Sequence, residues 1–353
     1  MKTISKSKPV MITGATGYVA GWIVKKLLDE GLTVHAPVRD PNKKEKLKYL
    51  DDLAKNAKGS IKYFKADLLE KGSYDEAMKG CELVIHTASP FVTSVKDPQK
   101  DLIDPALNGT RNVLESVNRT ETVKRVVLTS SCAAIYGDNI DIKKAPGQVL
   151  TEEIWNTTSS LDHQPYSYSK TLAEKEAWNI NEKQDRWDMV VINPSLVLGP
   201  GINPTSTSES FNIIKQMGDG SFKTGVPEFY IGTVDVRDVA QAHFRAAFTP
   251  DARGRYITSA NDSGFPEIAE ILREKFGDKF PFPKKTLPKF LVLLLGPLSG
   301  LKRKMLKRNV GHRFRADNSK IRKDLGMKFR PLEESVTDFF QQMIDHDIVK
   351  PKK

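Results

Sequence analysis

The chain has 353 residues, of which 39% are apolar and 28% are charged. Such a composition can fill the core of one large domain or two ordinary ones, and it excludes disordered, collagen-like and coiled-coil proteins. The formal net charge is +11, but residues 284–330 alone carry fifteen Lys or Arg against Asp317 and Asp324, a net of +13. The rest of the chain is therefore close to neutral, and the basic segment needs its own explanation.

The cysteines and the amino terminus indicate the compartment. Cys81 and Cys132 are too few for a disulfide framework and lack the spacing of a zinc site. The amino terminus has no apolar signal core, and the longest apolar run is far shorter than the ~20 residues that span a bilayer. We therefore expect a cytoplasmic protein, and its six scattered histidines predict no metal site.

The first 130 residues alternate strand-like and helix-like segments. The predicted strands are 10–13, 33–38, 61–66, 83–87 and 126–130, and the predicted helices are 18–30, 42–56 and 106–117. This alternation predicts an α/β fold, a doubly wound parallel Rossmann sheet with helices on both faces. Because such sheets bind ligands beyond the carboxyl ends of their strands, we expect the site there.

The second half of the chain is less regular. A polar loop over 135–165 leads to a predicted helix at 167–183 and a strand at 189–193. We predict a cofactor-binding Rossmann domain over 1–195, with sheet elements returning near 229–250. Residues 196–353 are expected to form most of a smaller, discontinuous C-terminal cap that binds the substrate.

A glycine-rich turn, TGATGYVAG, follows the first strand and opens the first helix. Its glycines allow a tight turn in which backbone N–H groups approach phosphate oxygens at the positive end of the helix. An ordinary strand–helix turn is the alternative, but the strand before it and the helix after it favour a nucleotide site. The residues expected to contact the cofactor here are Gly14, Thr16, Gly17, Tyr18 and Val19.

The end of the second strand distinguishes the two nicotinamide cofactors. An acidic residue there would hold the ribose 2′-hydroxyl of NADH, whereas an arginine accommodates the 2′-phosphate of NADPH. Arg39 stands at this position, with several lysines in the next helix that could add a second charge. The alternative is a solvated basic helix start, and the acidic Asp40 beside Arg39 counts against NADPH, but the order favours NADPH over NADH.

Further candidates follow the third, fourth and sixth strands. Asp67 could bind the adenine amino group, with Leu68 beside it, or could only cap a helix. A run of small residues after the fourth strand could let the cofactor lie close to the backbone; these residues are Thr87, Ala88, Ser89 and Pro90. Pro194, after the sixth strand, could form a wall beside the nicotinamide.

A tyrosine and a lysine are spaced for one helix face. Tyr166 and Lys170 lie four residues apart, so their hydroxyl and ammonium groups can address the same ligand. A nearby ammonium stabilises a phenolate, which suits a general acid that protonates a developing alkoxide. The alternative is an exposed helix face without function. Ser130 and Ser131 end the fifth strand, where a hydroxyl could stabilise an oxyanion.

Together these segments resemble the extended short-chain dehydrogenase/reductases of the NAD-dependent epimerase/dehydratase family, in the branch of dihydroflavonol, cinnamoyl-CoA and yeast carbonyl (aldehyde) reductases. The resemblance rests on TGATGYVAGWIVKKLL, VRDPNKKEKLKYL, KADLLEKGSYDEAMKGCELVIHTASP, NGTRNVLES, RVVLTSS, YSYSKTLAEKEAW, INPSLVLGP and VDVRDVAQAH. It implies that Ser131, Tyr166 and Lys170 are catalytic. The cofactor positions that it implies are Gly14, Gly17, Arg39, Lys46, Asp67, Tyr166, Lys170, Pro194 and Val197.

The resemblance implies an NADPH-dependent reductase that transfers hydride to an aldehyde or ketone, with Tyr166 giving the proton. Ser131 would orient the carbonyl oxygen, and Lys170 would bind ribose hydroxyls. Gln164 and Pro165 replace the Asn-Trp pair of plant cinnamoyl-CoA reductases, which argues against copying their CoA-thioester substrate. The alternatives are a 3β-hydroxysteroid-type dehydrogenase, a nucleotide-sugar epimerase, and a non-catalytic NADP-sensing regulator.

The basic segment has three interpretations. A solvated surface of the cap is favoured, attraction of an anionic substrate or NADPH comes second, and contact with an anionic membrane surface comes last. No nucleic-acid-binding motif is recognisable, so we expect no nucleic acid partner. The expected partner is a small carbonyl substrate, and the protein is expected to be a monomer or homodimer.

Overall fold

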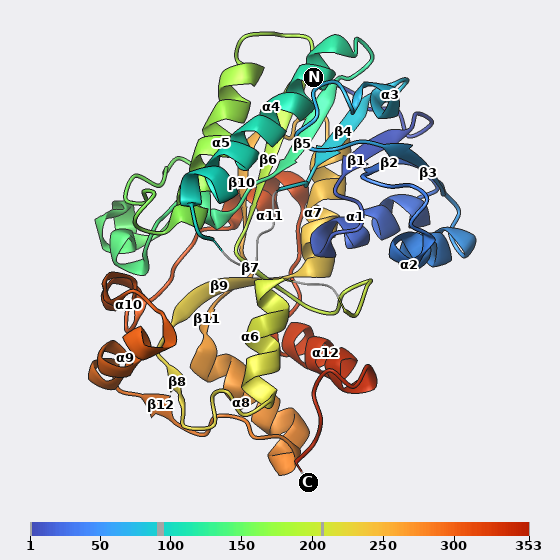
Figure 1. The fold of residues 1–353 in the computed structure, drawn as a ribbon. Coiled ribbons are helices and arrows are strands. Elements are labelled where there is room, and N and C mark those ends of the chain that lie inside the picture. Colours follow the sequence, from blue (N-terminus) through green and yellow to red (C-terminus); the bar gives the residue numbers. More distant parts are fainter. Residues whose placement is uncertain (1, 90–94, 206–207, 353) are drawn as a thin grey trace.

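The fold is organised around a seven-stranded sheet, seen in a computed structural model that describes residues 2–89, 95–205 and 208–352 (Figure 1). All pairs in this sheet are parallel, in the order β10-β6-β5-β4-β1-β2-β3. The strands are β1 (Val10–Thr13), β2 (Thr33–Val38), β3 (Ser60–Lys65), β4 (Leu83–His86), β5 (Arg125–Thr129), β6 (Asp188–Pro194) and β10 (Gly254–Thr258). The strand order reverses between β1 and β4, which is where a Rossmann fold binds its ligand. The predicted doubly wound parallel sheet is confirmed.

Helices cover both faces of this sheet. One face packs against α1 (Tyr18–Asp29), α2 (Lys44–Lys55), α7 (Val236–Phe248) and α11 (Ser319–Leu325). The other packs against α3 (Asp75–Met78), α4 (Asp104–Arg119) and α5 (Pro165–Asn181), and a π-helical turn (Gln99–Ile103) leads into α4. The central strands VMIT and LVIH are fully buried on both faces, and each is apolar except for its last residue, Thr13 or His86.

Helix α1 shows why the local sequence folds as it does. Ile23, Val24, Leu27 and Leu28 recur at helical spacing and are fully buried against the sheet. Each such side chain contributes about 1.5–3 kcal/mol by leaving water. The helix therefore holds its amino-terminal end, and the glycine turn before it, at the carboxyl edge of β1.

A smaller cap follows the sheet in the chain and lies below it in Figure 1. Its strands are β7 (Leu196–Leu198), β9 (Tyr230–Asp235) and β11 (Asn261–Gly264) in one sheet, and β8 (Val226–Pro227) and β12 (Thr286–Leu287) in another. Its helices are α6 (Glu209–Gly218), α8 (Phe265–Phe276), α9 (Lys289–Leu295), α10 (Arg303–Asn309) and α12 (Leu332–Asp345). A cluster of phenylalanines, among them Phe211, Phe282, Phe339 and Phe340, fills the core between α6, α8 and α12.

The chain returns to the large sheet later than we expected. Helix α7, within the expected range 229–250, does pack on α1, but the strand that joins the sheet is β10, at 254–258. Strand β9, at 230–235, pairs instead with β7. The reason is that β7 leaves the large sheet just after β6 and provides a separate edge for β9.

The predicted loop over 135–165 contains short turns of 3₁₀ helix at Asn139–Lys144 and Pro146–Gln148, and a third turn, Cys132–Ala134, directly precedes it. The helix predicted at 167–183 begins at Pro165, so Tyr166 lies in its first turn. In the described part of the chain, no helix is long and apolar enough to cross a membrane.

Candidate active site

The glycine turn has the shape of a phosphate cradle. Gly14 has φ of +68°, which favours glycine, and a Cβ there would lie 3.1 Å from the backbone of Ala88. The N–H of Gly17 donates to the carbonyl of Gly14 at 2.8 Å. Gly17 caps α1 without any side-chain hydrogen bond, so the first N–H groups of the helix remain available to an anion.

Strand β4 is joined to β1 directly beside this turn. The Thr13 hydroxyl accepts the N–H groups of Thr87 and Ala88 at 3.1 and 3.0 Å, and the Thr87 hydroxyl donates to the Thr13 carbonyl. His86 lies 2.8 Å from the same Thr13 hydroxyl. Thr87 and Ala88 therefore lie directly against Gly14, with little space between them. Ser89, which follows them, is exposed. Pro90 lies outside the described residues.

The other three residues expected to contact the cofactor at this turn differ in their exposure and contacts. Thr16 is exposed at the turn, and Val19 is half-buried against the core of the sheet. The Tyr18 hydroxyl donates to the carbonyl of Gly199 at 2.6 Å, and its ring packs against Phe339 of the cap. Only the backbone of Tyr18 is therefore free to meet a cofactor.

Arg39, after β2, and Lys46, in α2, form no ion pair with any residue that the structure describes. Arg39 and Lys46 are both exposed. The ion pairs of α2 within the described ranges join Asp52 to other lysines, Lys48 and Lys55. Asp40 accepts the N–H of Asn42 at 2.9 Å, so its carboxylate stabilises the turn after β2. This local role weakens the argument that Asp40 holds a ribose hydroxyl.

Asp67 and Leu68 lie where β3 ends and face α4. One carboxylate oxygen of Asp67 accepts the N–H of Leu69 at 2.9 Å and so stabilises a turn; no helix begins directly after Asp67 in this described segment. Leu68 packs so closely on Gly109 that a Cβ there would lie 2.6 Å from its Cγ. The backbone after β3 is thereby fixed against α4.

The two serines after β5 have different surroundings. The hydroxyl of Ser130 is buried and donates to the Glu174 carboxylate. The hydroxyl of Ser131 is half-buried, accepts the N–H of Ala133 at 3.1 Å, and donates to the carbonyl of Pro194 at 3.5 Å. Ser130 thus donates to a buried carboxylate, whereas Ser131 donates only a long bond, which a ligand oxygen could replace.

Tyr166 and Lys170 lie one helical turn apart at the start of α5. The Lys170 Nζ is 6.0 Å from the centre of the Tyr166 ring, and Tyr166 is 53% exposed. Lys170 also lines a small cavity of about 20 Å³ together with Ala88, Ser89 and Ser130. Lys170 therefore connects the tyrosine to the small residues that follow β4, next to the glycine turn.

The family model described as "NAD dependent epimerase/dehydratase family" matches residues 10–257, which include the glycine turn, Ser131, Tyr166 and Lys170. The chain belongs to this family. Cinnamoyl-CoA reductase CAD2 of Medicago truncatula is 42% identical over 282 residues, 78% of this chain and 83% of that protein. Tetraketide alpha-pyrone reductase 1 of Arabidopsis thaliana is 35% identical over 343 residues, 95% of each chain. Gre2 of Candida albicans, solved in complex with NADPH, has a TM-score of 0.77 and 29% identity, covering 96% of this chain and 98% of that one.

The membership in the extended short-chain dehydrogenase/reductases that the sequence predicted is thereby confirmed.

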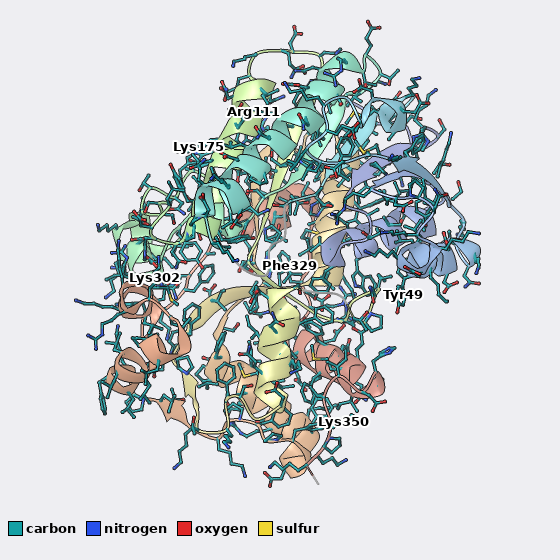
Figure 2. All side chains as sticks on the ribbon, viewed as in Figure 1. Tyr49, Arg111, Lys175, Lys302, Phe329 and Lys350 are labelled. Carbon is teal, nitrogen blue, oxygen red and sulfur yellow. The ribbon has the colours of Figure 1, made fainter. Side chains whose placement is uncertain are left out.

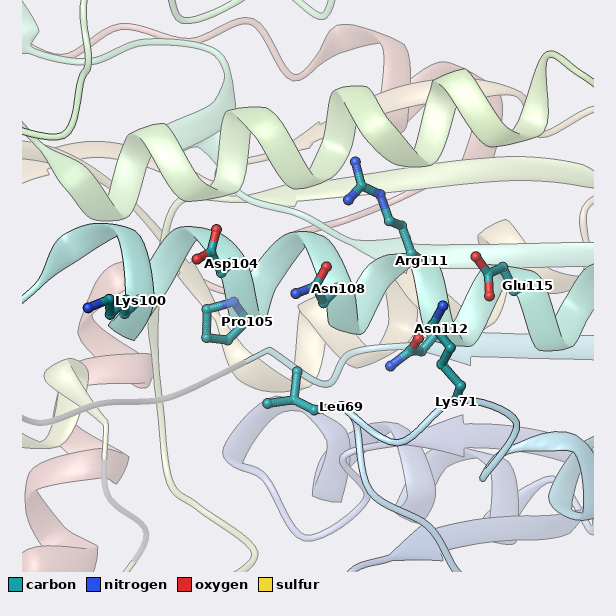
Figure 3. Close-up of a pocket in the computed structure, with 9 residues that line it drawn as sticks. All are labelled: Leu69, Lys71, Lys100, Asp104, Pro105, Asn108, Arg111, Asn112 and Glu115. Carbon is teal, nitrogen blue, oxygen red and sulfur yellow. The ribbon is translucent and has the colours of Figure 1, made fainter.

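A groove of about 560 Å³, larger than the cavity beside Lys170, is not part of the predicted active site: it lies on the outer face of α4 (Figure 3). Its lining carries both charge signs and contains none of the predicted residues; it consists of Leu69, Lys71, Lys100, Asp104, Pro105, Asn108, Arg111, Asn112 and Glu115.

In this member of the epimerase/dehydratase family, Glu174 holds the site together, and we did not single it out from the sequence. Its buried carboxylate accepts bonds from Ser130, from the Asn193 side chain at 2.8 Å and from Arg255 Nε at 2.6 Å. These bonds join α5 to β5, β6 and β10. The sequence did hold a signal, since Tyr166, Lys170 and Glu174 are spaced four residues apart along one helix face.

Two buried polar atoms at the end of β6 fit a bound polar ligand. Asn193 Oδ1 and Ser195 Oγ have no hydrogen-bond partner among the described residues. Buried polar atoms are rarely left unpaired, because each costs free energy without a partner. Both flank Pro194, which was expected to lie beside the nicotinamide; half-buried Val197 follows in β7. Together with the open helix end at Gly17, these atoms suit the polar groups of a dinucleotide.

A second buried carboxylate, Asp138, fixes the start of the helix that carries Tyr166. It accepts bonds from His163 at 2.6 Å, Gln164 at 3.0 Å, Asn309 at 2.7 Å and Arg308. Gln164 is in the left-handed region, with φ of +57°, directly before α5. Hydrogen bonding holds the pKa of the Asp138 carboxyl below its usual range, against the opposing effect of burial, with His163 the largest such contribution. Asp138 thus couples the cap to the first turn of α5.

Proposed function

We propose that the protein is an NADPH-dependent reductase of aldehyde or ketone carbonyls, with Tyr166 as the general acid. The observation that carries this proposal is the position of Lys170. Its ammonium lies beside the Tyr166 ring and lines the same cavity as Ala88 and Ser89, which border the glycine turn. The proposed proton donor would therefore lie next to the proposed cofactor site at the switch point of the sheet.

The cofactor assignment rests on this chain's own residues and on its relatives. The open helix end at Gly17 would take the pyrophosphate, while Arg39 and Lys46 would take the 2′-phosphate that distinguishes NADPH. Gre2 of yeast, described as a methylglyoxal/isovaleraldehyde reductase, was also solved with NADPH and is 28% identical. When bound, the reduced nicotinamide would supply a hydride to the carbonyl carbon.

Three side chains would share the rest of the chemistry. The Ser131 hydroxyl would donate to the carbonyl oxygen and hold it for protonation. The Tyr166 hydroxyl would give its proton to that oxygen as negative charge develops on it. The Lys170 ammonium would stabilise the resulting phenolate and bind ribose hydroxyls.

The proposal includes the arrangement of the whole chain. Residues 1–195 would form the cofactor domain, completed by α7 and β10, and most of 196–353 would cap the substrate. The substrate pocket would be formed by the 132–165 loop, residues around 195–230 and the carboxyl-terminal part of the chain; residues 206–207 lie outside the description. We place the protein in the cytoplasm as a monomer or homodimer acting on a small carbonyl compound.

Substitution of the proposed acid tests the function. Tyr166→Phe should lower kcat by about 10²–10⁴-fold, the usual contribution of a general acid, while NADPH affinity changes little. Tyr168→Phe, on the same helix and without a proposed role, should stay near wild-type activity. The measurement is NADPH oxidation across aldehydes, diketones, flavonoid ketones and acyl-CoA thioesters, together with fluorescence titration of NADPH.

Two outcomes would contradict the proposal. A Tyr166→Phe variant with wild-type turnover would remove the general acid. Tight NADP binding by the wild-type protein without turnover of any carbonyl would instead favour a non-catalytic sensor.

A further inference from the structure

The carboxyl-terminal part of the cap exposes a group of large apolar side chains. Nine such side chains are exposed among the described residues, and five of them lie within twelve positions of the chain. These five, which we call the apolar patch, are Phe290, Leu294, Leu295, Leu298 and Leu301. Leu298 is 84% exposed and Phe290 is 68% exposed, although both are leucine-sized or larger. Soluble surfaces rarely concentrate apolar side chains in this way unless another surface covers them.

The segment that bears the patch is folded and amphipathic. Helices α9 and α10, joined by the turn Gly296–Ser299, pack on each other around a small core of Val292, Leu306 and Val310. This core faces Phe229 and Leu287 of the cap. The patch residues thus form the outer face of a hairpin whose inner face is already filled.

Positive charge directly follows the patch along the chain, and Arg303 Nε donates to the carbonyl of Leu293 in α9 at 3.3 Å. Between Lys285 and Ala316 the sequence contains no Asp or Glu. Lys302, Arg303, Lys304 and Lys307 are all exposed, and none of them forms an ion pair with another described residue. The apolar patch is therefore bordered by cations that nothing in this part of the chain neutralises.

The hairpin is attached firmly to the molecule. Arg308 and Asn309 bind the buried Asp138, and the Lys302 ammonium donates to the carbonyl of Asp162 at 2.9 Å. Figure 1 places α9 and α10 side by side at one edge of the cap, and Figure 2 shows Lys302 at the outer margin of α10. The apolar and basic groups are thus presented together on a fixed, protruding surface.

We propose that the α9–α10 hairpin docks on an anionic membrane surface, with the apolar patch inserted at the boundary between headgroups and acyl chains. Amphipathic segments that combine leucine and phenylalanine with lysine and arginine bind in this way. Charge decides between this partner and a second copy of the chain. Pairing two hairpins would bring two unneutralised basic borders together, whereas anionic headgroups complement them.

Vesicle co-sedimentation tests the docking. The full-length protein is mixed with vesicles of phosphatidylcholine alone or of phosphatidylcholine with phosphatidylserine, at low and high salt. We expect partition onto the anionic vesicles at low salt, and about tenfold weaker partition when salt screens the charges or when phosphatidylserine is omitted. Leu294→Gln with Leu298→Gln, and separately Lys304→Gln with Lys307→Gln, should each weaken partition by a similar factor.

Matched variants separate the patch from general effects. Leu69→Gln removes an equally exposed leucine from the sheet domain, and Lys58→Gln with Lys183→Gln removes two exposed lysines far from the hairpin in sequence. These should partition like the wild type, and all variants should keep wild-type NADPH oxidation. Failure to bind anionic vesicles at low salt, or unchanged binding by the Leu294/Leu298 variant, would overturn the proposal. So would light scattering that shows a dimer in the wild type and a monomer in that variant.

Discussion

At the scale of single residues, Ser130 and Ser131 show how the same side chain takes different roles at adjacent positions. Successive residues at the end of a strand point in opposite directions. Ser130 points toward α5 and donates to Glu174, while Ser131 remains half-buried near Pro194. The choice between them in the sequence depended on family resemblance, because residue type alone does not distinguish the two.

Alanine substitution should separate these roles. Ser131→Ala should lower kcat by about 10²-fold or more with little change in stability, since it removes a proposed donor to the carbonyl oxygen. Ser130→Ala should lower the free energy of unfolding by about 1–3 kcal/mol, because buried Glu174 loses a donor. Steady-state kinetics and urea denaturation of both variants check this. The reverse assignment, a stable but inactive Ser130→Ala, would make Ser130 the catalytic serine.

Two buried histidines predict how stability depends on pH. Burial lowers the pKa of His243 to about 4, and burial, with a smaller effect of the Lys170 charge, lowers the pKa of His86 to about 3. His243 is satisfied as a neutral ring, 2.7 Å from the Thr129 hydroxyl and 2.8 Å from the Val239 carbonyl. As the pH falls, these two histidines would become protonated near pH 6.5 in the unfolded chain but only at lower pH in the folded protein. The stabilisation is therefore complete above about pH 6.5 and is lost as pH falls toward the folded values.

We expect the free energy of unfolding to fall between pH 6.5 and 5 by up to about 2 kcal/mol for each of these histidines. His243→Gln should reduce the slope by one histidine's share, whereas exposed His346→Gln should leave it unchanged. Urea denaturation at half-unit pH steps measures the slope. A stability that is flat over this range would show that the two rings are not buried as neutral groups.

At the scale of elements, helix α5 is where prediction from sequence succeeded and also reached its limit. The helix begins within two residues of the expected start, and Tyr166 and Lys170 could be proposed as a pair because their spacing is local. The contacts that hold this helix were not predicted. Arg308 and Asn309 are 170 and 171 residues from Asp138, and periodicity gives no information at that separation.

Asp138→Asn tests whether this contact positions the helix. It should lower the free energy of unfolding by about 1.5–3 kcal/mol, because hydrogen bonds to a charged group are lost. It should also lower kcat more than NADPH affinity, since Gln164 would no longer fix the turn before Tyr166. Asp162→Asn, an exposed residue in the same loop, is the control for denaturation and kinetics. A variant with wild-type stability and kcat would show that Asp138 positions nothing.

At the scale of the whole molecule, the parallel sheet was predictable because alternating strands and helices allow few topologies. The sequence shows where the basic residues are concentrated, but it does not show which of them form ion pairs. Arg308, Arg313 and Arg330 of the basic segment form ion pairs with Asp138, Glu267 and Asp238. Within the described ranges, Lys302, Arg303, Lys304 and Lys307 form none. Among the three interpretations of the basic segment, we placed membrane contact last because a sequence does not tell whether apolar side chains between positions 290 and 301 are buried.

Cofactor choice is also a property of the whole molecule, since any ligand that binds only the folded state stabilises all of it. Ligand at 100 times its Kd adds about 2.7 kcal/mol to the free energy of unfolding. NADPH should therefore raise Tm by several degrees, and NADH at the same concentration should raise it less. Arg39→Ala should reduce the NADPH shift toward that of NADH, because it removes one of the two charges proposed to bind the 2′-phosphate, while Lys58→Ala should not. Thermal denaturation measures this, and equal shifts by both cofactors in the wild type would assign NADH an equal place in the site.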